Sequence, residues 1–298
     1  MQNKDAFSRF HPLVNFLYFG IILSFSMISM QPVCLFISAL CAILYYVTLK
    51  GAKAARLLLH GVFPVFLLAV IINPAFSHEG NTILCYLPTG NPLTLESIIY
   101  GVASGIMMVG ILLWFACFTE VVTSDKFVYL FGRIIPALSL LLSMTLRFVP
   151  RFTSQFSTVR EVQKTLGRDT ENGSLLSRIK NAVACFSIVV TWSLENAIET
   201  ADSMKSRGYG TKKRTAYSIY RFEERDRTAL CFLIFCGLFL LSTGLAGKLF
   251  WRYFPDIRGV VTDPLTILAE LCFLLLCTLP IFLDRKEERV WNSLRSGI

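Results

Sequence analysis

The chain has 298 residues, of which 54% are hydrophobic and 16% are charged. Ordinary soluble domains average about 25% charged residues, so this composition excludes a typical soluble fold and favours a protein that spans a lipid bilayer. The net charge is +9. The basic residues flank the apolar stretches and form no separate soluble face, so the charge is better explained by membrane topology and lipid contact than by nucleic-acid binding.

Apolar stretches of about 20 residues are long enough to cross a hydrocarbon core about 30 Å thick as a helix. The sequence predicts six such spans, at Pro12–Ser29, Pro32–Leu49, Leu57–Asn73, Ile98–Phe118, Ala229–Phe250 and Pro264–Leu283. The stretch Phe127–Leu146 is also apolar, but Arg133 and Pro136 interrupt it, so it is either a seventh span or a helix at the membrane interface. We therefore expect an all-α integral membrane protein with about six transmembrane helices.

Loop charge predicts the orientation. Lys50, Lys53 and Arg56 fill the loop after the second span, whereas 74–97 contains neither Lys nor Arg. Because basic residues gather on the cytoplasmic side, both termini are expected in the cytoplasm of a cell (plasma) membrane protein, although Arg252 and Arg258 fall outside. A seventh span would place the long basic segment after the fourth span outside, which favours an interfacial helix at 127–146.

This topology divides the chain into three parts. They are residues 1–119 with four spans, 120–227 with a cytoplasmic or interfacial helical segment, and 228–298 with two spans and a tail. Of the nine cysteines, seven lie in predicted spans, Cys185 lies in the middle part, and Cys85 alone is expected outside. We therefore expect neither a disulfide nor a metal site.

Two amphipathic helices are predicted in the middle part. The first begins near Arg151 and repeats apolar residues at helical spacing, at Phe152, Phe156, Val159 and Leu166. The stretch Asp169–Gly173 reads as a turn. The second helix is expected from Ser174 to Arg207, where glycine follows, and its apolar stripe includes Phe186, Val190 and Leu194. The stripes are expected to pack on each other and on the membrane spans.

Arg207 stands at the predicted end of the second helix and is followed by Gly208. A planar, permanently charged guanidinium at this place suits a bidentate contact with a carboxylate of a partner protein. The alternative is that Arg207 interacts only with its own helix dipole and with lipid phosphates.

Three stretches resemble the transmembrane T component of energy-coupling factor (ECF) transporters, the EcfT/CbiQ family. They are Ile72–Phe76 with the following Asn91–Gly101, then Leu146–Pro150, and finally Ala201–Tyr209. The last is similar to the second Arg-Gly coupling motif of the family and is the most specific of the three. In this order, around six spans, they extend the resemblance over most of the chain.

The resemblance implies a non-catalytic subunit without cofactors, whose two ABC-type ATPase partners bind ATP. These ATPases would dock on the helix ends, and a small substrate-binding S component would rest on the helices for uptake of a vitamin or a transition-metal ion. The matching ATPase-coupling residues are Ser206, Arg207, Gly208, Gly167 and Arg168. The surface for the S component would comprise Phe152, Phe156, Val159, Phe186, Val190 and Leu194.

The first coupling motif departs from the family pattern. An Ala-Arg-Gly is expected near the end of the first helix, but aligning Gly167 puts Leu166 in the place of the arginine. Arg168, two positions further on, either replaces the missing arginine or is a solvated turn residue paired with Asp169.

Rival functions rest on weaker patterns. His60 and Glu270 are ionisable residues in predicted spans. The alternative function is therefore a self-contained secondary transporter with an intramembrane site near these two residues. The simpler role for both side chains is hydrogen bonding between helices. His78 and Glu79 make a weak metal site at most. The sequence contains no phosphate-binding Gly-x-x-x-x-Gly-Lys loop, which argues against ATP hydrolysis by this chain.

Overall fold

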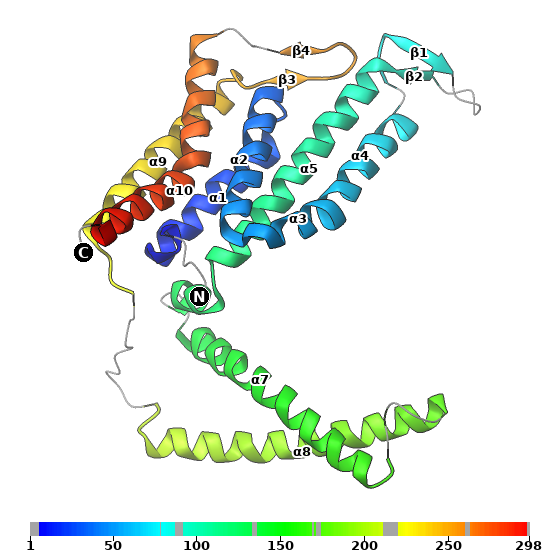
Figure 1. The fold of residues 1–298 in the computed structure, drawn as a ribbon, viewed down its shortest axis with the longest axis vertical. Coiled ribbons are helices and arrows are strands. Elements are labelled where there is room, and N and C mark those ends of the chain that lie inside the picture. The colour runs from blue at the N-terminus through cyan, green and yellow to red at the C-terminus, as the bar shows by residue number, and fades with distance from the viewer. Residues whose placement is uncertain are drawn as a thin grey trace. The chain divides into compact units, whose positions relative to one another are not determined.

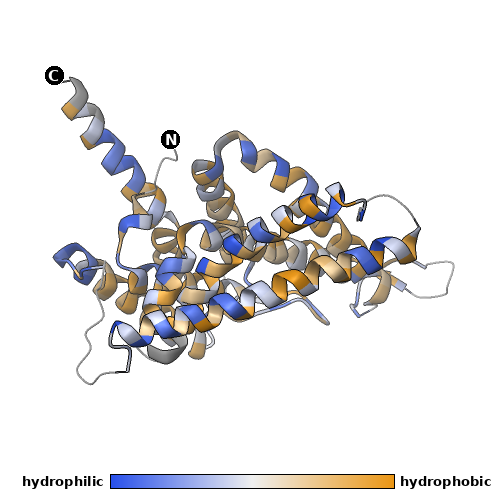
Figure 2. Ribbon diagram, turned by 90° about the horizontal axis from the view of Figure 1, so that it is seen from below, coloured by the Kyte–Doolittle hydropathy of each residue, from blue (hydrophilic) through white to orange (hydrophobic). Residues whose placement is uncertain are grey.

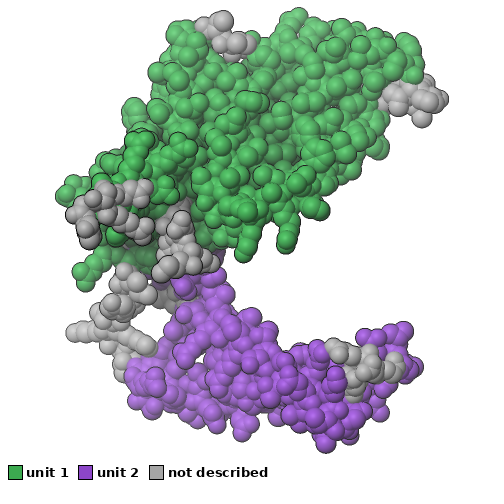
Figure 3. Space-filling model, viewed as in Figure 1, with its two compact units in different colours: residues 1–123, 220–298 green, residues 124–219 purple. Residues whose placement is uncertain are grey.

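The computed structural model describes residues 6–77, 79–86, 92–132, 136–168, 170, 174–210, 220–259 and 263–296. Over these ranges the chain is almost entirely helical, with two small two-stranded antiparallel sheets (Figure 1). It forms two compact units (Figure 3). Unit 1 contains residues 1–123 and 220–298, and unit 2 contains residues 124–219.

Unit 1 holds the apolar helices. Its helices are α1 (Pro12–Ile28), α2 (Pro32–Lys50), α3 (Ala54–Leu57), α4 (Phe63–Phe76), α5 (Leu95–Val121), α9 (Glu224–Leu245) and α10 (Pro264–Ser296). Short 3₁₀ turns at Phe7–Arg9 and Gly51–Lys53 and a π-helical turn at Leu58–Val62 complete the helical part. Strands β1 (Ile83–Tyr86) and β2 (Pro92–Thr94) pair with each other, as do β3 (Trp251–Arg252) and β4 (Arg258–Gly259).

Five helical stretches are long and apolar enough to cross a membrane, which confirms the all-α membrane class. They are Pro32–Phe76, Leu95–Val121, Leu175–Ser206, Glu224–Leu245 and Pro264–Trp291. The first contains two predicted spans, because Gly51 ends α2 with a φ of +56°. Helix α1 is apolar but shorter, with 17 residues. Leu175–Ser206, the least apolar of the five, lies in the basic middle segment that the loop charges predict to be outside the bilayer.

Unit 2 contains α6 (Ser124–Gly132), α7 (Pro136–Thr165) and α8 (Leu175–Ser206). No single helix of the described residues covers 127–146, and no membrane-span candidate among them falls there. The predicted start of the first amphipathic helix at Arg151 was wrong, because α7 already begins at Pro136, where proline suits a first helical turn. Leu146–Pro150 therefore lies inside α7, with Pro150 removing only one helical donor.

The chain divides into its two units at 123/124 and 219/220. The predicted three-part division at 119/120 and 227/228 stays a prediction. Helix α9 begins five residues before its apolar stretch. Glu223 caps this helix, and its backbone N–H donates to Asp226 Oδ2 at 3.0 Å. A capping box satisfies helix-end donors before the membrane-facing part begins.

An aromatic cluster joins α1, α2 and α5 in unit 1. Tyr18, Phe19, Tyr45 and Trp114 are all fully buried there, and the ring centroids of Tyr18 and Trp114 lie 6.3 Å apart. The Trp114 indole N–H donates to Ser38 Oγ at 3.0 Å, which satisfies its polar group inside an apolar core.

The first family-like region packs α4 against α5. Asn73 Nδ2 donates to Ser104 Oγ at 2.6 Å and to Ala69 O at 3.1 Å. A Cβ on Gly101 would lie 3.3 Å from the Asn73 and Pro74 side chains, so only glycine allows this approach without a shift. The stretches at 72–76 and 98–101 are thus structural neighbours that join two apolar helices.

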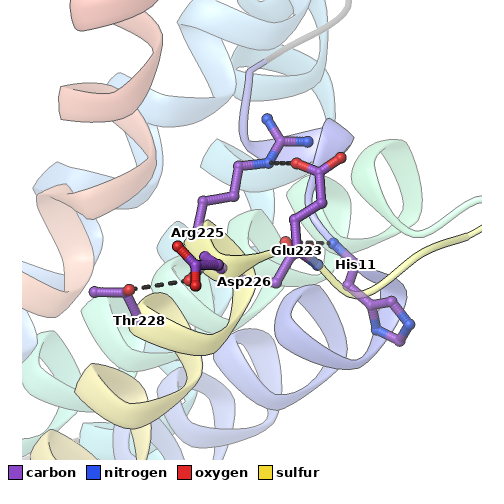
Figure 4. A network of polar contacts seen from close by, with 6 residues as sticks. His11, Glu223, Arg225, Asp226 and Thr228 are labelled. Atoms are coloured by element: carbon purple, nitrogen blue, oxygen red, sulfur yellow. Dashed lines mark hydrogen bonds and ion pairs between the residues drawn. The ribbon is translucent and has the colours of Figure 1, made fainter.

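One buried carboxylate ties the start of α9 to the start of α1 (Figure 4). Asp226 is 2% exposed, and its Oδ1 accepts the backbone N–H of His11 at 3.0 Å. His11 in turn caps α1, where its Nδ1 accepts from the Leu13 N–H at 3.2 Å. Two helix N-termini that are far apart in sequence therefore share one anion, which their dipoles favour.

We expect Asp226→Asn to lower the free energy of unfolding of unit 1 by about 1–3 kcal/mol. The NH₂ group of the asparagine cannot accept a hydrogen bond, so one of the two backbone donors, His11 N–H or Glu223 N–H, would lose its acceptor. Thermal unfolding of the detergent-solubilised protein measures this loss. Glu224→Gln is the matched control, since Glu224 lies in the same helical turn and its side chain is exposed. Equal unfolding temperatures for the two variants would show that Asp226 does not tie the helices.

Candidate functional site at the helix ends of unit 2

Helices α7 and α8 cross near the middle of each helix. The ring centroids of Phe152 and Trp192 lie 6.0 Å apart in an edge-on arrangement. The guanidinium carbon of Arg151 lies 5.4 Å from the centroid of the Trp192 ring, a cation–π contact. Cys185 and Val189 on α8 are buried. The crossing is therefore a defined aromatic and apolar contact.

The two predicted apolar stripes differ in how far their side chains are buried. Phe152, Phe156 and Val159 on α7 are half-buried. The α8 stripe, defined here as Ile179, Val183, Phe186, Val190 and Leu194, is exposed along its whole length, with Phe186 and Leu194 both 63% exposed. The expectation that the two stripes pack on each other was therefore wrong for α8, and packing of this stripe on the membrane spans stays a prediction.

The reason lies in the residues that α8 turns toward α7. Its buried and half-buried positions recur at helical spacing on a different face, at Asn181, Cys185, Val189, Trp192 and Asn196. On this face, Trp192 contacts Phe152 of α7. The aliphatic stripe lies on the other face and is exposed. Figure 2, seen from below, shows apolar and polar residues alternating along this helix.

Helix α8 ends in a Schellman motif, in which a left-handed glycine lets the last carbonyls find donors. Gly208 has a φ of +81°. Three backbone hydrogen bonds close the end: Arg207 N to Ser203 O at 3.2 Å, Gly208 N to Lys205 O at 3.0 Å and Tyr209 N to Met204 O at 3.0 Å. The cap fixes the backbone at Arg207, whose side chain is exposed.

Helix α7 ends in the same motif. Gly167 has a φ of +77°. The corresponding bonds are Leu166 N to Val162 O at 3.3 Å, Gly167 N to Lys164 O at 3.0 Å and Arg168 N to Gln163 O at 2.9 Å. The residue before each cap also makes the same side-chain hydrogen bond. Thr165 Oγ1 donates to Val162 O at 2.7 Å, and Ser206 Oγ donates to Ser203 O at 2.8 Å.

This match aligns the two ends residue by residue. Leu166 occupies the position of Arg207, and Arg168 occupies the position of Tyr209. Both arginine side chains are exposed, and within the described ranges neither guanidinium has a hydrogen-bond or ion-pair partner. The predicted pairing of Arg168 with Asp169 lies outside the described residues. A repeated Lys-Ser/Thr-x-Gly at 164–167 and 205–208 was the sequence signal for this equivalence.

The two ends lie on arms of similar length. At 1.5 Å per residue, each end is about 20 Å along its helix from the Phe152–Trp192 contact. The chain turns back between α7 and α8, and Arg178 Nε near the start of α8 donates to Thr170 O at 3.1 Å. The ends therefore point in different directions, up to about 40 Å apart.

His60 and Glu270 stand in separate surroundings. His60 lies in the π-helical turn and is exposed, whereas Glu270 Oε1 accepts from Gln31 Nε2 at 2.5 Å. The π-turn packs on α3, α4 and α5, and α10 packs on α2 and α9. The described residues contain no group of three or more His, Cys, Asp or Glu side chains placed to hold a metal. His78 lies outside them.

These elements define a multi-pass helical membrane protein with a crossed pair of long amphipathic helices in its middle segment. The profile of the CbiQ family, described as cobalt transport protein, matches residues 4–217. The chain therefore belongs to the CbiQ family.

Several relatives are named energy-coupling factor transporter transmembrane protein EcfT. That of Lactobacillus helveticus is 32% identical over 106 residues, 35% of this chain and 38% of the relative. That of Lacticaseibacillus paracasei is 35% identical over 106 residues, 35% of this chain and 40% of the relative. The Staphylococcus aureus protein is 24% identical over 205 residues, 64% of this chain and 75% of the relative. The chain thus spans less than half the length of the first two.

Proposed function

We propose that this chain is the transmembrane coupling subunit of an ECF-type importer. In this role it binds two cytoplasmic ABC-type ATPases and a small membrane protein that recognises a vitamin or a transition-metal ion, and it hydrolyses no ATP itself. The observation that carries the proposal is the pair of equivalent capped ends, at 164–168 and 205–209, each with an exposed arginine. The printed names of the EcfT relatives support it.

The chemistry of a capped end suits docking of a soluble partner. The Schellman motif holds the backbone at Arg207 in one conformation, so little backbone entropy is lost when a partner binds. A guanidinium presents a planar fork of donors that pairs with a carboxylate through two hydrogen bonds. With no partner among the described residues, Arg207 is available for such a contact.

The α8 stripe supports an apolar membrane partner. Five large aliphatic or aromatic side chains along one helix face form the kind of exposed patch that marks an interaction surface. In the proposed arrangement, α8 lies at the cytoplasmic interface and its stripe contacts the membrane-embedded S component. Both chain termini then lie in the cytoplasm. The arrangement also accounts for an apolar composition that satisfies the criteria of a membrane span.

The crossing provides a mechanical link. Because α7 and α8 meet through rigid aromatic side chains at Phe152 and Trp192, a shift at either helix end moves the α8 stripe with it. Approach of the two ATPases on binding ATP would therefore reach the S component as a rigid-body movement of the helix pair.

Purification of the tagged chain from its native membranes tests this function. We expect the fraction eluted in mild detergent to hydrolyse ATP and to contain ATPase subunits, and we expect the chain separated from them to have no such activity. Elution of the chain without ATPase activity would refute the proposed function.

A further inference from the structure

The last turns of α10 carry three exposed apolar side chains. Val290 is 52% exposed, Trp291 is 54% exposed and Leu294 is 57% exposed. At about 100° per residue, positions 290, 291 and 294 fall on one side of the helix. We call these three residues the tail patch. A grouped apolar surface on a helix that continues from a membrane span indicates a contact with protein or with lipid.

The same face of α10 holds the start of the chain. Asp284 Oδ1 accepts the backbone N–H of Ala6 at 2.6 Å, and the Glu287 carboxylate pairs with the Arg9 guanidinium. Positions 284, 287, 291 and 294 follow the three-and-four spacing of one helix face. The segment that contacts Asp284 and Glu287 directly precedes α1, the first predicted span. The face that bears the tail patch is therefore turned toward the edge of the bilayer at which α1 begins.

Helix α10 is longer than a membrane span, with 33 residues. Its predicted span, Pro264–Leu283, is about 30 Å long, which matches the hydrocarbon core. A straight continuation would hold Trp291 about 12 Å beyond the hydrocarbon, past most of the headgroup layer. Pro280 lies inside the helix, and Figure 1 shows that α10 changes direction along its length. Because proline removes a helical hydrogen bond and favours a kink, the last turns leave the direction of the span.

The bent end of α10 extends away from the other helices of unit 1, as Figure 2 shows beside the C label. Arg285 and Lys286 follow the predicted span directly, and both are exposed. By helical spacing they lie outside the side that bears the tail patch. Long basic side chains of this kind reach lipid phosphates while an apolar face meets the acyl chains. The segment therefore has the pattern of a helix that lies in the membrane surface.

We propose that the last turns of α10 are an amphipathic anchor in the phospholipid surface. The tail patch inserts among the acyl chains, and Arg285 and Lys286 bind lipid phosphates. Through Asp284 and Glu287, the anchor also holds the start of the chain at the membrane edge. A soluble partner would need the patch to face away from the bilayer, against the direction that this contact gives it. The proposal depends on the membrane-spanning class of the chain and is independent of the coupling function.

The fluorescence of Trp291 tests this proposal. The full chain, with the partners that it retains, is placed in bilayers of phosphatidylcholine and phosphatidylglycerol, with either ordinary acyl chains or acyl chains brominated near the headgroup. The chain has 4 tryptophans, so Trp291→Phe is measured in parallel, and the difference between the two proteins gives the emission of Trp291. We expect this emission to be quenched by the brominated lipid and to be protected from iodide in the water.

Leu294→Glu should lower the equilibrium constant for the lipid-bound end about tenfold or more, since it removes a buried leucine and adds a charge. Quenching of Trp291 by brominated lipid should then fall, and quenching by iodide should rise. Ser293→Glu is the matched control, because Ser293 is exposed outside the tail patch and the variant adds the same charge. It should behave as the unchanged chain does.

Two results would overturn the anchor. The first is a Trp291 emission that iodide quenches and brominated lipid does not. The second is protection of Trp291 from both quenchers that is lost when protein partners are removed, which would assign the tail patch to a protein contact. Either result leaves the coupling function standing, because that function is tested by the retained ATPase subunits.

Discussion

Arg207→Glu is expected to release one ATPase subunit from the purified complex and to abolish its coupled ATP hydrolysis. The side chain is exposed at a fixed helix cap and has no partner in the described part of the chain. Reversal of its charge would set two negative groups against each other, and losing one member of a desolvated charge pair costs about 2–5 kcal/mol. Affinity should therefore fall by about 30-fold or more, measured as ATPase subunits retained per chain.

Two further variants sharpen this test. Arg289→Glu makes the same charge reversal at an exposed position on α10 and should retain every partner. Arg207→Lys keeps the charge but loses the planar fork, so its affinity should lie between the unchanged chain and Arg207→Glu. If Arg207→Glu retains both ATPase subunits, Arg207 does not dock a partner.

Leu194→Arg is expected to remove the small membrane partner and to leave both ATPase subunits in place. Leu194 lies within the α8 stripe and is 63% exposed, so the substitution should not disturb the fold. In a complex it would lose the burial of a leucine, about 1.5–3 kcal/mol, and bring a charge into an apolar contact. Recovery of the small membrane protein with the tagged chain measures this effect.

Thr191→Arg provides the control for this prediction. Thr191 is exposed about one turn before Leu194, outside the stripe, and the substitution adds the same side chain and charge. Equal recovery of the small membrane protein with the two variants would show that the α8 stripe is not its contact surface.

The ends of α8 could be predicted from local sequence because both follow short-range rules. Ser174 caps the start, where its hydroxyl oxygen accepts from the Ser177 N–H at 3.4 Å, and Gly208 supplies the left-handed residue at the end. The apolar helices α1, α2, α4, α5, α9 and α10, which hold the six predicted spans, followed in the same way from length and composition. The class of the fold therefore rests on local information.

The pairing faces of α7 and α8 could not be predicted, because they depend on contacts between distant residues. The aliphatic stripe of α8 has the helical period of a packed face, yet Trp192 on another face meets Phe152. Periodicity shows that a face is apolar and leaves open what covers it. Likewise, the shift of Arg168 was visible in sequence, but the equality of the two caps became clear only from their hydrogen bonds.

The mass of the intact complex, purified through a tag on this chain and measured under non-denaturing conditions, tests the coupling function most directly. We expect a particle with one copy of this chain, two ATPase subunits and one small membrane protein. A particle that contains this chain alone, or only further copies of it, would refute the coupling function.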